Sequence, residues 1–537
     1  MIEARLDSSG AIVEISPDGE ILELDGLPRA YGAPRGDPAM EENLPAWRGH
    51  FAFAIFDPTQ RELRAYRDHY GARPLYYCRT DDRLLLSSSI PQILSRLPEP
   101  PRLDAVAVRD YLAHGAPREG RTFHEGLRRL PAASRLIADR RGLRVERYWS
   151  PWDEEAAIAA RRGGAEGRRT RLRELIADAV RDALADRFPT AYLLSGGPDS
   201  SALLGMASAL ARSGANASPA PRAALTLSFE KNVDCDEGSI ARETAALHGV
   251  PWLQVPVEAW SPIGILDEFI ERHGEPPGTI NLMLEARLFA TASAAGATSV
   301  VDGHDADALF TPSAAYFSHL VSHLRWIRCV REVVAMNRLH AYSYARVARA
   351  AIAPLARAML WRRDPRSSEN LRGTQPFGRA EAERILAPAV GMALEATRTL
   401  ERMHGVEGRH PYFDPALVRF VLAAPMEERY FLGKTKIMLR EGLADLYTPR
   451  VRNRLDKTNY TAYVDWALRS HAGDDLRVLA ERGSLALAGP QDRQRAGEQI
   501  REYLGGRGAH RSAVWRMLAT NRFLLRRGRD AFGGEQQ

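Results

Sequence analysis

Cysteine is scarce in this sequence: 537 residues contain only three, Cys78, Cys235 and Cys329, and no C-x-x-C pair. Neither a disulfide framework nor a cysteine-based zinc site is therefore expected. No stretch approaches the roughly 18 to 20 uninterrupted apolar residues that a membrane span needs. Residues 1–5 are not followed by the apolar segment of a secretory signal. These absences predict a soluble, cytoplasmic protein with no membrane partner.

A large excess of one charge is also absent. The 74 Lys and Arg residues against 68 Asp and Glu residues give a net charge of +6, and arginine supplies nearly all of the positive charge. A protein that coats nucleic acid carries a much larger excess, so no nucleic-acid partner is expected. Local basic surfaces that attract phosphates or acidic peptides are compatible with this balance.

The pattern of apolar residues divides the chain into two parts. Residues 1–155 carry short apolar runs separated by turn residues, which predicts a β-rich domain. In residues 170–537, short buried strands alternate with helices, which predicts an α/β domain with a doubly wound parallel sheet. Beyond Phe310 the chain is expected to be helical to its end, with a helical insertion at about residues 312–400. The strands expected in the second part are residues 191–194, 223–229, 253–257 and 299–302.

The most informative motif is Ser-Gly-Gly-Pro-Asp-Ser-Ser at residues 195–201, between a predicted strand and a predicted helix. Two adjacent glycines let backbone N–H groups converge on an anion, and the following helix directs its positive end to the same point. The serines add hydroxyl donors, and Asp199 offers a carboxylate to a divalent ion. The spacing differs from G-x-x-x-x-G-K-[ST], so a Walker-type loop is excluded. The motif therefore predicts a pyrophosphate-binding loop.

These residues resemble the PP-loop of ATP pyrophosphatases, which cleave ATP to AMP and pyrophosphate while adenylating a carboxylate. Further segments resemble asparagine synthetase B-type enzymes, in the order of that family. They are residues 300–310 (VVDGHDADALF, like S-G-x-G-x-D-E-L-F), 410–418 (like P-F-L-D-x-x-L-V), 436–440 (KIMLR, like K-x-x-L-R) and 451–460 (VRNRLDKTNY, like R-x-K-x-x-F). The resemblance implies a synthetase-like fold over most of the second part.

The first part resembles the glutaminase domain of the same family, an Ntn-hydrolase-like β sandwich. The resemblance is carried by residues 48–57, 67–77, 126–131 and 147–149. In that family a cysteine directly after the initiator methionine hydrolyses glutamine. Position 2 here is Ile2, so no thiolate is expected there to attack glutamine. The domain is interpreted as an inactive structural module of residues 1–155.

Without ammonia from glutamine, the simplest acceptor is an amine of the substrate itself. Two branches of the family resemble this state: β-lactam and carbapenam synthetases, and the isopeptide-forming macrocyclases of lasso peptide biosynthesis. The second is favoured by the long arginine-rich segment between Phe310 and Pro411, which also carries aromatic residues such as Trp326. It is also favoured by His304, which stands where the β-lactam synthetases carry tyrosine. A solvated basic helix pair is the alternative interpretation of the arginine-rich segment.

The resemblance implies a set of ATP and Mg²⁺ residues. Asp199 and Asp307 are expected to hold magnesium through carboxylate oxygens on two loops. The residues expected to bind the leaving pyrophosphate are Ser195, Gly196, Gly197, Asp199, Ser200 and Ser201. Those expected at the adenine are Leu227, Ser228 and Phe229. Asp305 and Ala308 replace the family's usual Gly and Glu near Asp307.

Two residues are expected to take part in the chemistry. Lys457 aligns with the family lysine that neutralises charge in the acyl-adenylate transition state, and Lys434 and Lys436 are nearby competitors for that role. His304, with an ordinary pKa near 6.5, is a candidate base for the attacking amine. A structural histidine is the alternative, and the sequence does not identify a carboxylate that supports His304.

The sequence thus predicts an ATP-dependent lasso peptide cyclase. It would adenylate an Asp or Glu side chain of a linear core peptide, and the N-terminal amine would close a macrolactam. The implied partners are the precursor peptide and, by resemblance, a leader peptidase and a leader-recognition protein. The alternatives are a β-lactam or other small-molecule amide synthetase, an ammonia-dependent asparagine synthetase, and a non-enzymatic scaffold.

Overall fold

A computed structural model describes most of the chain. The described residues are 1–6, 12–16, 21–23, 44–118, 120–155, 157–158, 164–214, 219–311, 313–340, 376–455, 458, 460–482, 490–506 and 510–528. Among these residues, no helix combines the length and the apolar character needed to cross a membrane.

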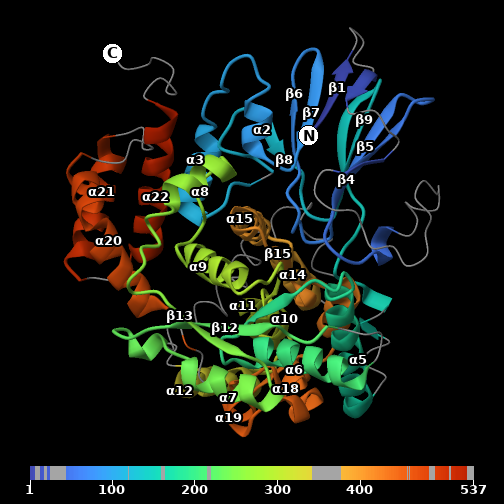
Figure 1. The fold of residues 1–537 in the computed structure, drawn as a ribbon, viewed down its shortest axis with the longest axis vertical. Helices are drawn as coiled ribbons and strands as arrows, with labels where there is room; N and C mark the ends of the chain where they lie inside the picture. The colour runs from blue at the N-terminus through green and yellow to red at the C-terminus, as the bar shows by residue number, and fades with distance from the viewer. Residues whose placement is uncertain are drawn as a thin grey trace.

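The N-terminal part is a sandwich of two antiparallel sheets (Figure 1). The strand orders are β2-β1-β7-β6-β8 and β10-β9-β5-β4-β3. Small and branched apolar residues from both sheets, such as Ile2, Ala54 and Leu63, meet between them and are almost completely buried. The strands are β1 (Ile2–Leu6), β2 (Ile12–Ser16), β3 (Ile21–Glu23), β4 (Ala52–Asp57), β5 (Glu62–Arg67), β6 (Tyr76–Arg79), β7 (Arg83–Ser87), β8 (Leu127–Arg129), β9 (Ser134–Asp139) and β10 (Gly142–Arg147). The predicted β-rich sandwich is confirmed.

Two helices accompany the sandwich, α2 (Ile90–Leu94) and α3 (Ala105–His114). Asp104 caps α3 by accepting hydrogen bonds from the backbone of Val106 and Ala107, which satisfies two N–H groups of the first turn. Gly115 ends the helix in the left-handed conformation at φ +86°. Helix α3, which is capped at both ends, packs against the last described helix, α22 (Arg511–Arg527).

The second part is built on a five-stranded parallel sheet of order β13-β12-β11-β14-β15. Its strands are β11 (Thr190–Leu193), β12 (Ala223–Ser228), β13 (Trp252–Pro256), β14 (Ser299–Val301) and β15 (Glu407–Arg409). The strand order reverses between β11 and β14, and ligands of such sheets bind at the carboxyl ends of the strands beside that reversal. The predicted doubly wound α/β fold is confirmed.

One expectation for this part is wrong. The chain beyond Phe310 was expected to be helical to its end, yet β15 adds a fifth strand to the sheet, pairing Ser299 with Glu407 and Val301 with Arg409. A short hairpin of β16 (Tyr430–Phe431) and β17 (Lys434–Thr435) follows. The reason is that β15 is only Glu-Gly-Arg. It has no apolar run of its own, and pairing with β14 alone makes it a strand.

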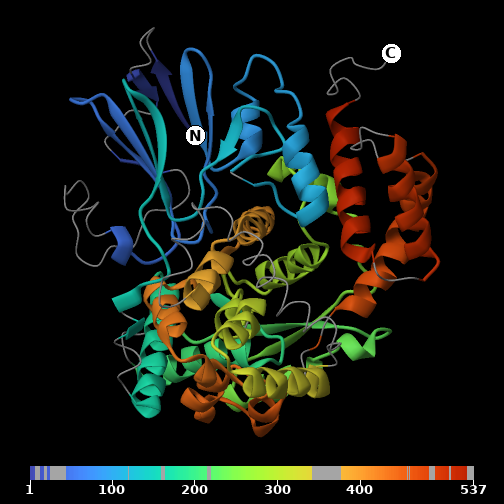
Figure 2. The ribbon, with the colours of Figure 1, turned by 180° about the vertical axis from the view of Figure 1, so that it is seen from behind.

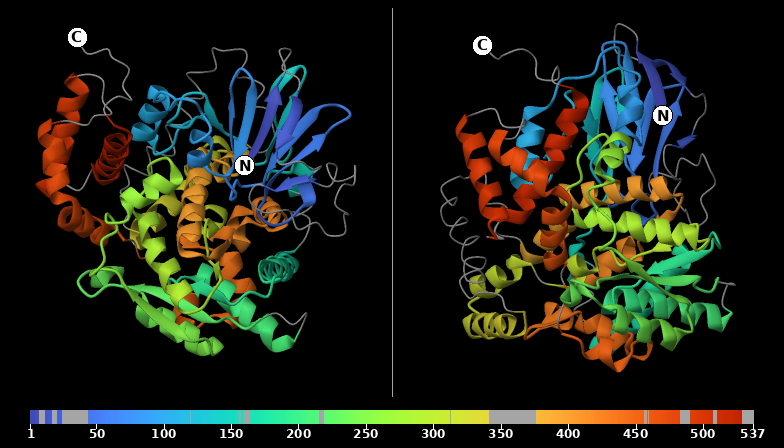
Figure 3. Two further views of the ribbon diagram at one scale, coloured as in Figure 1. Left: turned by 45° about the horizontal axis from the view of Figure 1, so that its top comes forward. Right: turned by 60° about the vertical axis from the view of Figure 1, so that its left-hand side comes forward.

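Helices cover both faces of the parallel sheet and continue as far as Arg527 (Figures 1 and 2). Those before residue 311 are α5 (Ala165–Ala183), α6 (Pro198–Ser213), α7 (Gly238–His248), α8 (Leu266–His273), α9 (Asn281–Ala294) and α10 (Ala306–Phe310). Those after it are α11 (Ala314–Ser322), α12 (Trp326–His340), α14 (Pro376–Ile385), α15 (Pro388–His404), α16 (Pro415–Ala423), α17 (Met426–Arg429), α18 (Ile437–Gly442), α19 (Pro449–Asn453), α20 (Thr461–Arg482), α21 (Pro490–Leu504) and α22. The last three form a bundle at one side of the molecule (Figure 3).

Helix α15 lies between the sandwich and the parallel sheet (Figure 1). Its Glu395 is fully buried and accepts hydrogen bonds from Arg67 at 2.7 Å, Tyr76 at 2.7 Å and Arg129, all from the first part. Arg129 also donates to the buried Glu275 at 2.7 Å. A buried carboxylate is stable only when its charge is compensated in this way. The two parts are therefore joined by a desolvated ionic contact.

Candidate active site

The Ser-Gly-Gly loop leaves β11 and enters α6. Gly196 has φ +67°, and a Cβ built on it would lie 3.2 Å from Cβ of Ile240 and 3.4 Å from Cβ of Glu237. A side chain at this position is therefore opposed by both backbone strain and close packing. Gly197 is the N-cap of α6 and carries no capping side chain, so it provides no side-chain acceptor to the first turn. The loop and helix thus keep the geometry of an anion-binding site.

The serines of the loop differ in accessibility. The Ser195 backbone N–H donates to Ser200 Oγ at 3.1 Å, and the two hydroxyl oxygens lie 3.2 Å apart. Ser195 is exposed, whereas Ser200 and Ser201 are buried, Ser201 completely. Ser195 and Ser200 are therefore the hydroxyls held together at the mouth of the loop, while the Ser201 side chain lies in the interior.

The two aspartates expected to bind metal lie together, each in the first turn of a helix: Asp199 in α6, which follows β11, and Asp307 in α10, which follows β14. A Cβ built on Gly303 would lie 3.6 Å from Cβ of Asp199, so the two segments touch. Lys436 connects the carboxylates: its ammonium pairs with Asp199 and lies 2.6 Å from Asp307 Oδ1. Two carboxylates already sharing one cation form a donor set that suits Mg²⁺. The geometry therefore fits the expected metal at Asp199 and Asp307.

Lys436 is the lysine that the structure places at this site. It is buried at the N-terminus of α18, with φ +59°. Burial alone would lower the pKa of its ammonium, but Asp199 and Asp307 raise that pKa above its ordinary value. Lys457, which was expected here, lies outside the described residues. Arg454 is described, and it donates to Glu237 at 2.7 Å and to the Gly196 carbonyl at 3.3 Å.

The three residues expected at the adenine lie where β12 ends, and β12 is the neighbour of β11 in the sheet. Leu227 and Phe229 are buried, whereas Ser228 is partly exposed. The Phe229 ring stacks on Tyr460 at 5.4 Å between ring centroids. Leu227 and Phe229 thus form the interior wall of this strand end, and Ser228 is the residue that can meet a ligand.

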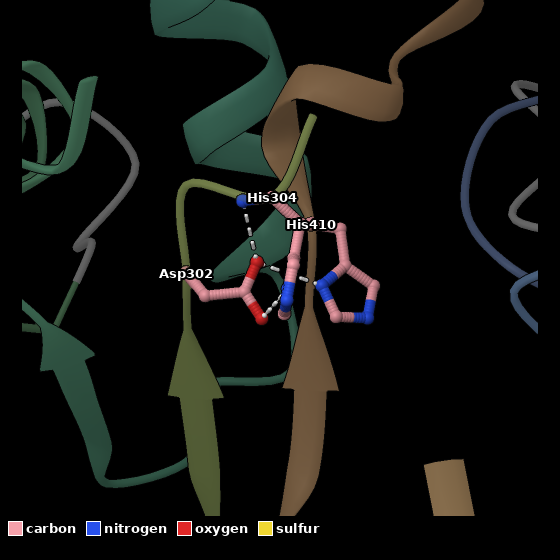
Figure 4. Close-up of side chains that lie close together, drawn as sticks. All are labelled: Asp302, His304 and His410. Carbon is pink, nitrogen blue, oxygen red and sulfur yellow. Dashed lines mark hydrogen bonds and ion pairs between the residues drawn. The ribbon is translucent and has the colours of Figure 1, made fainter. Parts of the chain in front are cut away.

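A charged cluster surrounds His304 at the ends of β14 and β15 (Figure 4). Because Val301 pairs with Arg409, the next residues, Asp302 and His410, stand side by side. Asp302 Oδ1 accepts from His410 Nδ1 at 2.9 Å, and Asp302 Oδ2 lies 2.7 Å from His304 Nδ1. The register of two neighbouring strands therefore creates the cluster.

Glu285 on α9 is the carboxylate next to His304. Glu285 Oε1 lies 3.0 Å from His304 Nε2, and its other oxygen accepts from Thr397 Oγ1 at 2.8 Å. Burial would lower the pKa of His304, but Asp302 and Glu285 raise it well above its ordinary value. The two carboxylates thus favour the imidazolium form of His304, in contrast to the ordinary pKa on which the expectation of a base rested.

His410 is a second imidazolium in the cluster. Burial opposes its charge, but Asp302 and Glu401 raise its pKa to about 9. The pKa of Asp302 is correspondingly held far below its usual range: burial would raise it, and His304 and His410 lower it. His410 and Lys436 both stand in segments that the sequence motifs identified; His410 had no role assigned to it, and Lys436 was named only as a competitor of Lys457. No sequence motif pointed to Glu285, and its one distinguishing feature in the sequence is that it is an ionisable residue in a mostly apolar helix.

Two hollows lie near these elements. One, of about 400 Å³, is at the junction of the two parts and is lined from both; its lining includes His50, Arg73, Arg409 and His410. The other, of about 380 Å³, lies between α12 and the β16–β17 hairpin and is lined by residues that include Arg325, Trp326, Ile327, Arg328, Arg331 and Phe431. Tyr316 and Phe317, two further aromatic residues of the arginine-rich segment, are buried in a core cluster.

The cysteines offer no accessible thiol. Cys78, Cys235 and Cys329 are all buried, and burial raises the pKa of each thiol. Ile2, at the position where the glutaminases carry their cysteine, is buried in β1, in the core of the sandwich. A buried thiol with a raised pKa is a poor nucleophile.

Comparison with known proteins agrees with this arrangement. The family model for asparagine synthase matches residues 171–525, and the model for a glutamine amidotransferase domain matches residues 39–149. Amidase chyE of Penicillium rubens is 30% identical over 286 residues, which cover 51% of this chain and 41% of the relative. Amidase chry2 of Gibberella zeae is 30% identical over 274 residues, covering 49% and 40%.

A bacterial relative matches a shorter region. The protein named asparagine synthetase [glutamine-hydrolyzing] 3 of Bacillus subtilis is 29% identical over 169 residues, which cover 31% of this chain and 27% of the relative. The matched regions cover less than half of the length of each of these three relatives.

Proposed function

Because this chain belongs to the asparagine synthase family, we propose that it is an ATP-dependent enzyme that forms an amide bond through an acyl-adenylate. The observation that carries this proposal is the placement of Asp199 and Asp307 around one buried cation, Lys436, beside the Ser-Gly-Gly loop. A substrate carboxylate would attack the α-phosphorus of ATP, and pyrophosphate would leave into the loop. Mg²⁺, held by Asp199 and Asp307, supplies charge neutralisation when bound.

A lysine at this site would stabilise the negative charge that builds up on the phosphates while the adenylyl group is transferred to the substrate carboxylate. Lys436 is fixed by its two carboxylates in a desolvated position, where a preorganised ammonium is most effective. Lys457 remains proposed for the acyl-adenylate transition state, as the family resemblance implies. Ser195 and Ser200 donate to the phosphates, and Ser228 meets the adenine.

The second half-reaction requires a free amine. The N-terminal ammonium and the imidazolium of His304 would each release one proton to solvent before the step. The neutral amine would then attack the acyl carbon, the proton that its nitrogen must still lose would pass to His304, and AMP would leave with the electron pair of the acyl C–O bond. Since the resting His304 is protonated, it accepts a proton only after losing the one it holds. A substrate ammonium beside it disfavours the imidazolium by like-charge repulsion, and Asp302 and Glu285 orient the ring that then takes up the amine's proton.

For the substrate we propose a linear peptide that is closed into a macrolactam, as in lasso peptide biosynthesis. The hollow between α12 and the hairpin supports this choice, because it combines arginines with exposed apolar side chains: Trp326 is 53% exposed and Ile327 is 80% exposed. Such a surface suits a peptide that carries both acidic and apolar residues. The β16–β17 hairpin forms one edge of this hollow, and Lys436 directly follows the hairpin in the sequence. The hairpin therefore connects the hollow to the residues around Asp199 and Asp307.

The test is direct. The full chain is incubated with ATP, Mg²⁺ and linear peptides that carry one Asp or Glu, and pyrophosphate–ATP exchange and the mass of the peptide are measured. Exchange together with loss of one water from the peptide supports the proposal. Exchange with amide formed only from added ammonium would favour an asparagine synthetase-like activity instead, and exchange only with a small amino acid that bears its own amine would favour a β-lactam synthetase-like one. No exchange with any carboxylate would favour a scaffold.

A further inference from the structure

A line of alternating charges runs from the amidotransferase-like domain to His304. Arg73 Nη1 lies 3.7 Å from Glu401 Oε2 on α15, and Glu401 Oε1 lies 3.6 Å from His410 Nε2. His410 then binds Asp302, and Asp302 contacts His304. The order of charges is positive, negative, positive, negative, positive. The line therefore crosses from one domain to the base of the other without a break.

Each member before His304 is removed from solvent. Arg73 is 3% exposed, Glu401 1%, His410 6% and Asp302 4%. Burial would raise the pKa of Glu401, but His410, Arg398 and Arg73 lower it to about 2. Since a buried charge with a missing partner is costly, each of these groups constrains the next one.

The first domain holds Arg73 in a fixed loop. The Asp68 carboxylate accepts hydrogen bonds from the backbone of Tyr70, Ala72 and Arg73 at 2.8 to 3.1 Å. Arg73 also pairs with Glu407 on β15. The arginine thus ties the loop after β5 to both α15 and the edge strand.

The synthetase domain makes room for this contact. A Cβ on Gly408 of β15 would overlap Glu401 Oε1, at 1.8 Å. Only glycine at this strand position lets Glu401 reach His410. The absence of a side chain at Gly408 is an observation separate from the charges, and it also supports the contact between Glu401 and His410.

We propose that Arg73 and Glu401 are positioning residues, through which the amidotransferase-like domain fixes the orientation and the proton affinity of His304. The catalytic consequence rests on the proposed function, but the positioning itself does not. A domain without an accessible thiol is then required for the synthetase site rather than for glutamine hydrolysis.

The charged groups around the two histidines fix the direction of the effect. The groups that face His304 or His410 are Asp302, Glu285, Glu401, Glu407, Asp305, Arg73, Arg398, Arg409 and His50. Burial and the neighbouring His410 hold the pKa of His50 itself well below its usual range. Glu401→Gln removes an anion that holds the proton of His410. Because His410 then loses its proton more readily, it competes less for the Asp302 charge and repels the imidazolium of His304 less, so the pKa of His304 rises further.

The first test follows the histidines of the full chain by NMR, with ¹³C-labelled histidine and the His304→Gln variant for assignment. In Glu401→Gln we expect the pKa of His304 to rise by about 0.5 or more. Arg73→Gln removes a cation instead, so Glu401 keeps its charge and holds the proton of His410 more firmly. The pKa of His304 should then shift in the opposite direction, and by less because Arg398 still faces Glu401, and Arg73→Lys should restore the wild-type value. The matched control is Arg402→Gln, the neighbouring helix position, which contacts Ser88 across the same interface; it leaves the titration unchanged.

The second readout separates positioning from folding. In Glu401→Gln, pyrophosphate–ATP exchange stays near the wild-type rate, whereas amide formation falls roughly two- to thirty-fold. An unchanged His304 titration in both Glu401→Gln and Arg73→Gln would overturn the proposal, as would equal losses in both half-reactions. A tightly bound transition metal in the purified protein would overturn it too, because Asp302, His304 and His410 also place three ligand atoms within 4.8 Å. Failure of the wild type to cyclise any peptide would refute the proposed function and leave the titration result decisive for positioning.

Discussion

At the scale of single residues, the site depends on a few backbone positions and a few buried charges. Gly196, Lys436 and His410 each hold a geometry or charge state that the local sequence does not enforce. Gly196 and Lys436 have positive φ values of 67° and 59°, and His410 is protonated only because of carboxylates from other elements. Each of the three offers a separate test.

Gly196→Ala should abolish pyrophosphate–ATP exchange and destabilise the fold by about 1–3 kcal/mol. The cause is the positive φ together with a contact to Ile240 at 3.2 Å. Gly214→Ala is the matched control, since Gly214 has φ +65° but nothing within 4 Å. It should lose stability without losing exchange. Equal exchange in the two variants would contradict the role of the loop.

Lys436→Met removes the ammonium that Asp199 and Asp307 share. We expect a loss of about 1–3 kcal/mol in the free energy of unfolding, kept modest because the Asp307 side chain is 43% exposed. Added Mg²⁺ should recover part of the loss, and exchange should still fall. The control is Lys434→Met, two residues earlier and exposed. Chemical denaturation with and without Mg²⁺ checks this, and a Mg²⁺-independent loss would count against the metal assignment.

The pH dependence of stability follows from His410. Its folded pKa of about 9 lies above the ordinary 6.5, so the stabilisation is fully present below about pH 6.5 and is lost as the pH rises through 9. Over that window the free energy of unfolding should fall by roughly 1–3 kcal/mol. Urea denaturation from pH 6 to 10 should show this slope in the wild type and a weaker slope in His410→Gln. The same slope in both proteins would refute the charge state of His410.

At the scale of elements, β15 is the piece that completes the site. It places Glu407 and His410 in register with β14, and its glycine accommodates Glu401. Gly408→Ala should therefore displace Glu401, destabilise the protein by about 1–3 kcal/mol and slow amide formation more than exchange. Gly391→Ala, inside α15 with nothing within 4 Å, should be neutral or stabilising. Thermal unfolding and both half-reactions distinguish the two glycines.

The elements also show what the sequence can and cannot predict. The strand–loop–helix around residues 195–201 is predictable, because its apolar strand, glycines and helix are contiguous. The strand β15 is not, because Glu-Gly-Arg has no apolar pattern and pairing with β14 defines it. The contacts of His304 are equally hidden from the sequence. His304 lies in the turn before α10, Glu285 is 19 positions away on helix α9, and Asp302 meets His410 across 108 positions.

At the scale of the whole molecule, the buried cluster around Glu395 joins the two domains. Glu395→Gln should leave Arg67 with an uncompensated buried charge and Arg129 with Glu275 as its remaining carboxylate, and cost about 3–5 kcal/mol. Calorimetry should then resolve two transitions where we expect one for the wild type, since the sandwich has a core of its own, and Tyr70, Ala72 and Trp149 of the first part remain packed in the core that includes the parallel sheet. A single transition in the variant would show that apolar packing of α15 suffices to couple the domains.

For the whole molecule we propose an ATP-dependent, amide-forming site at the carboxyl ends of β11 and β14, where the strand order reverses. The N-terminal sandwich acts as a structural partner of this site. The measurement that tests it most directly is pyrophosphate–ATP exchange by the full chain with a carboxylate-bearing peptide, compared with Asp199→Asn and Asp307→Asn. The account predicts peptide-dependent exchange in the wild type and at least about a hundredfold less in each variant, because each removes a metal ligand. Exchange that is absent in the wild type, or unaffected by either substitution, would contradict it.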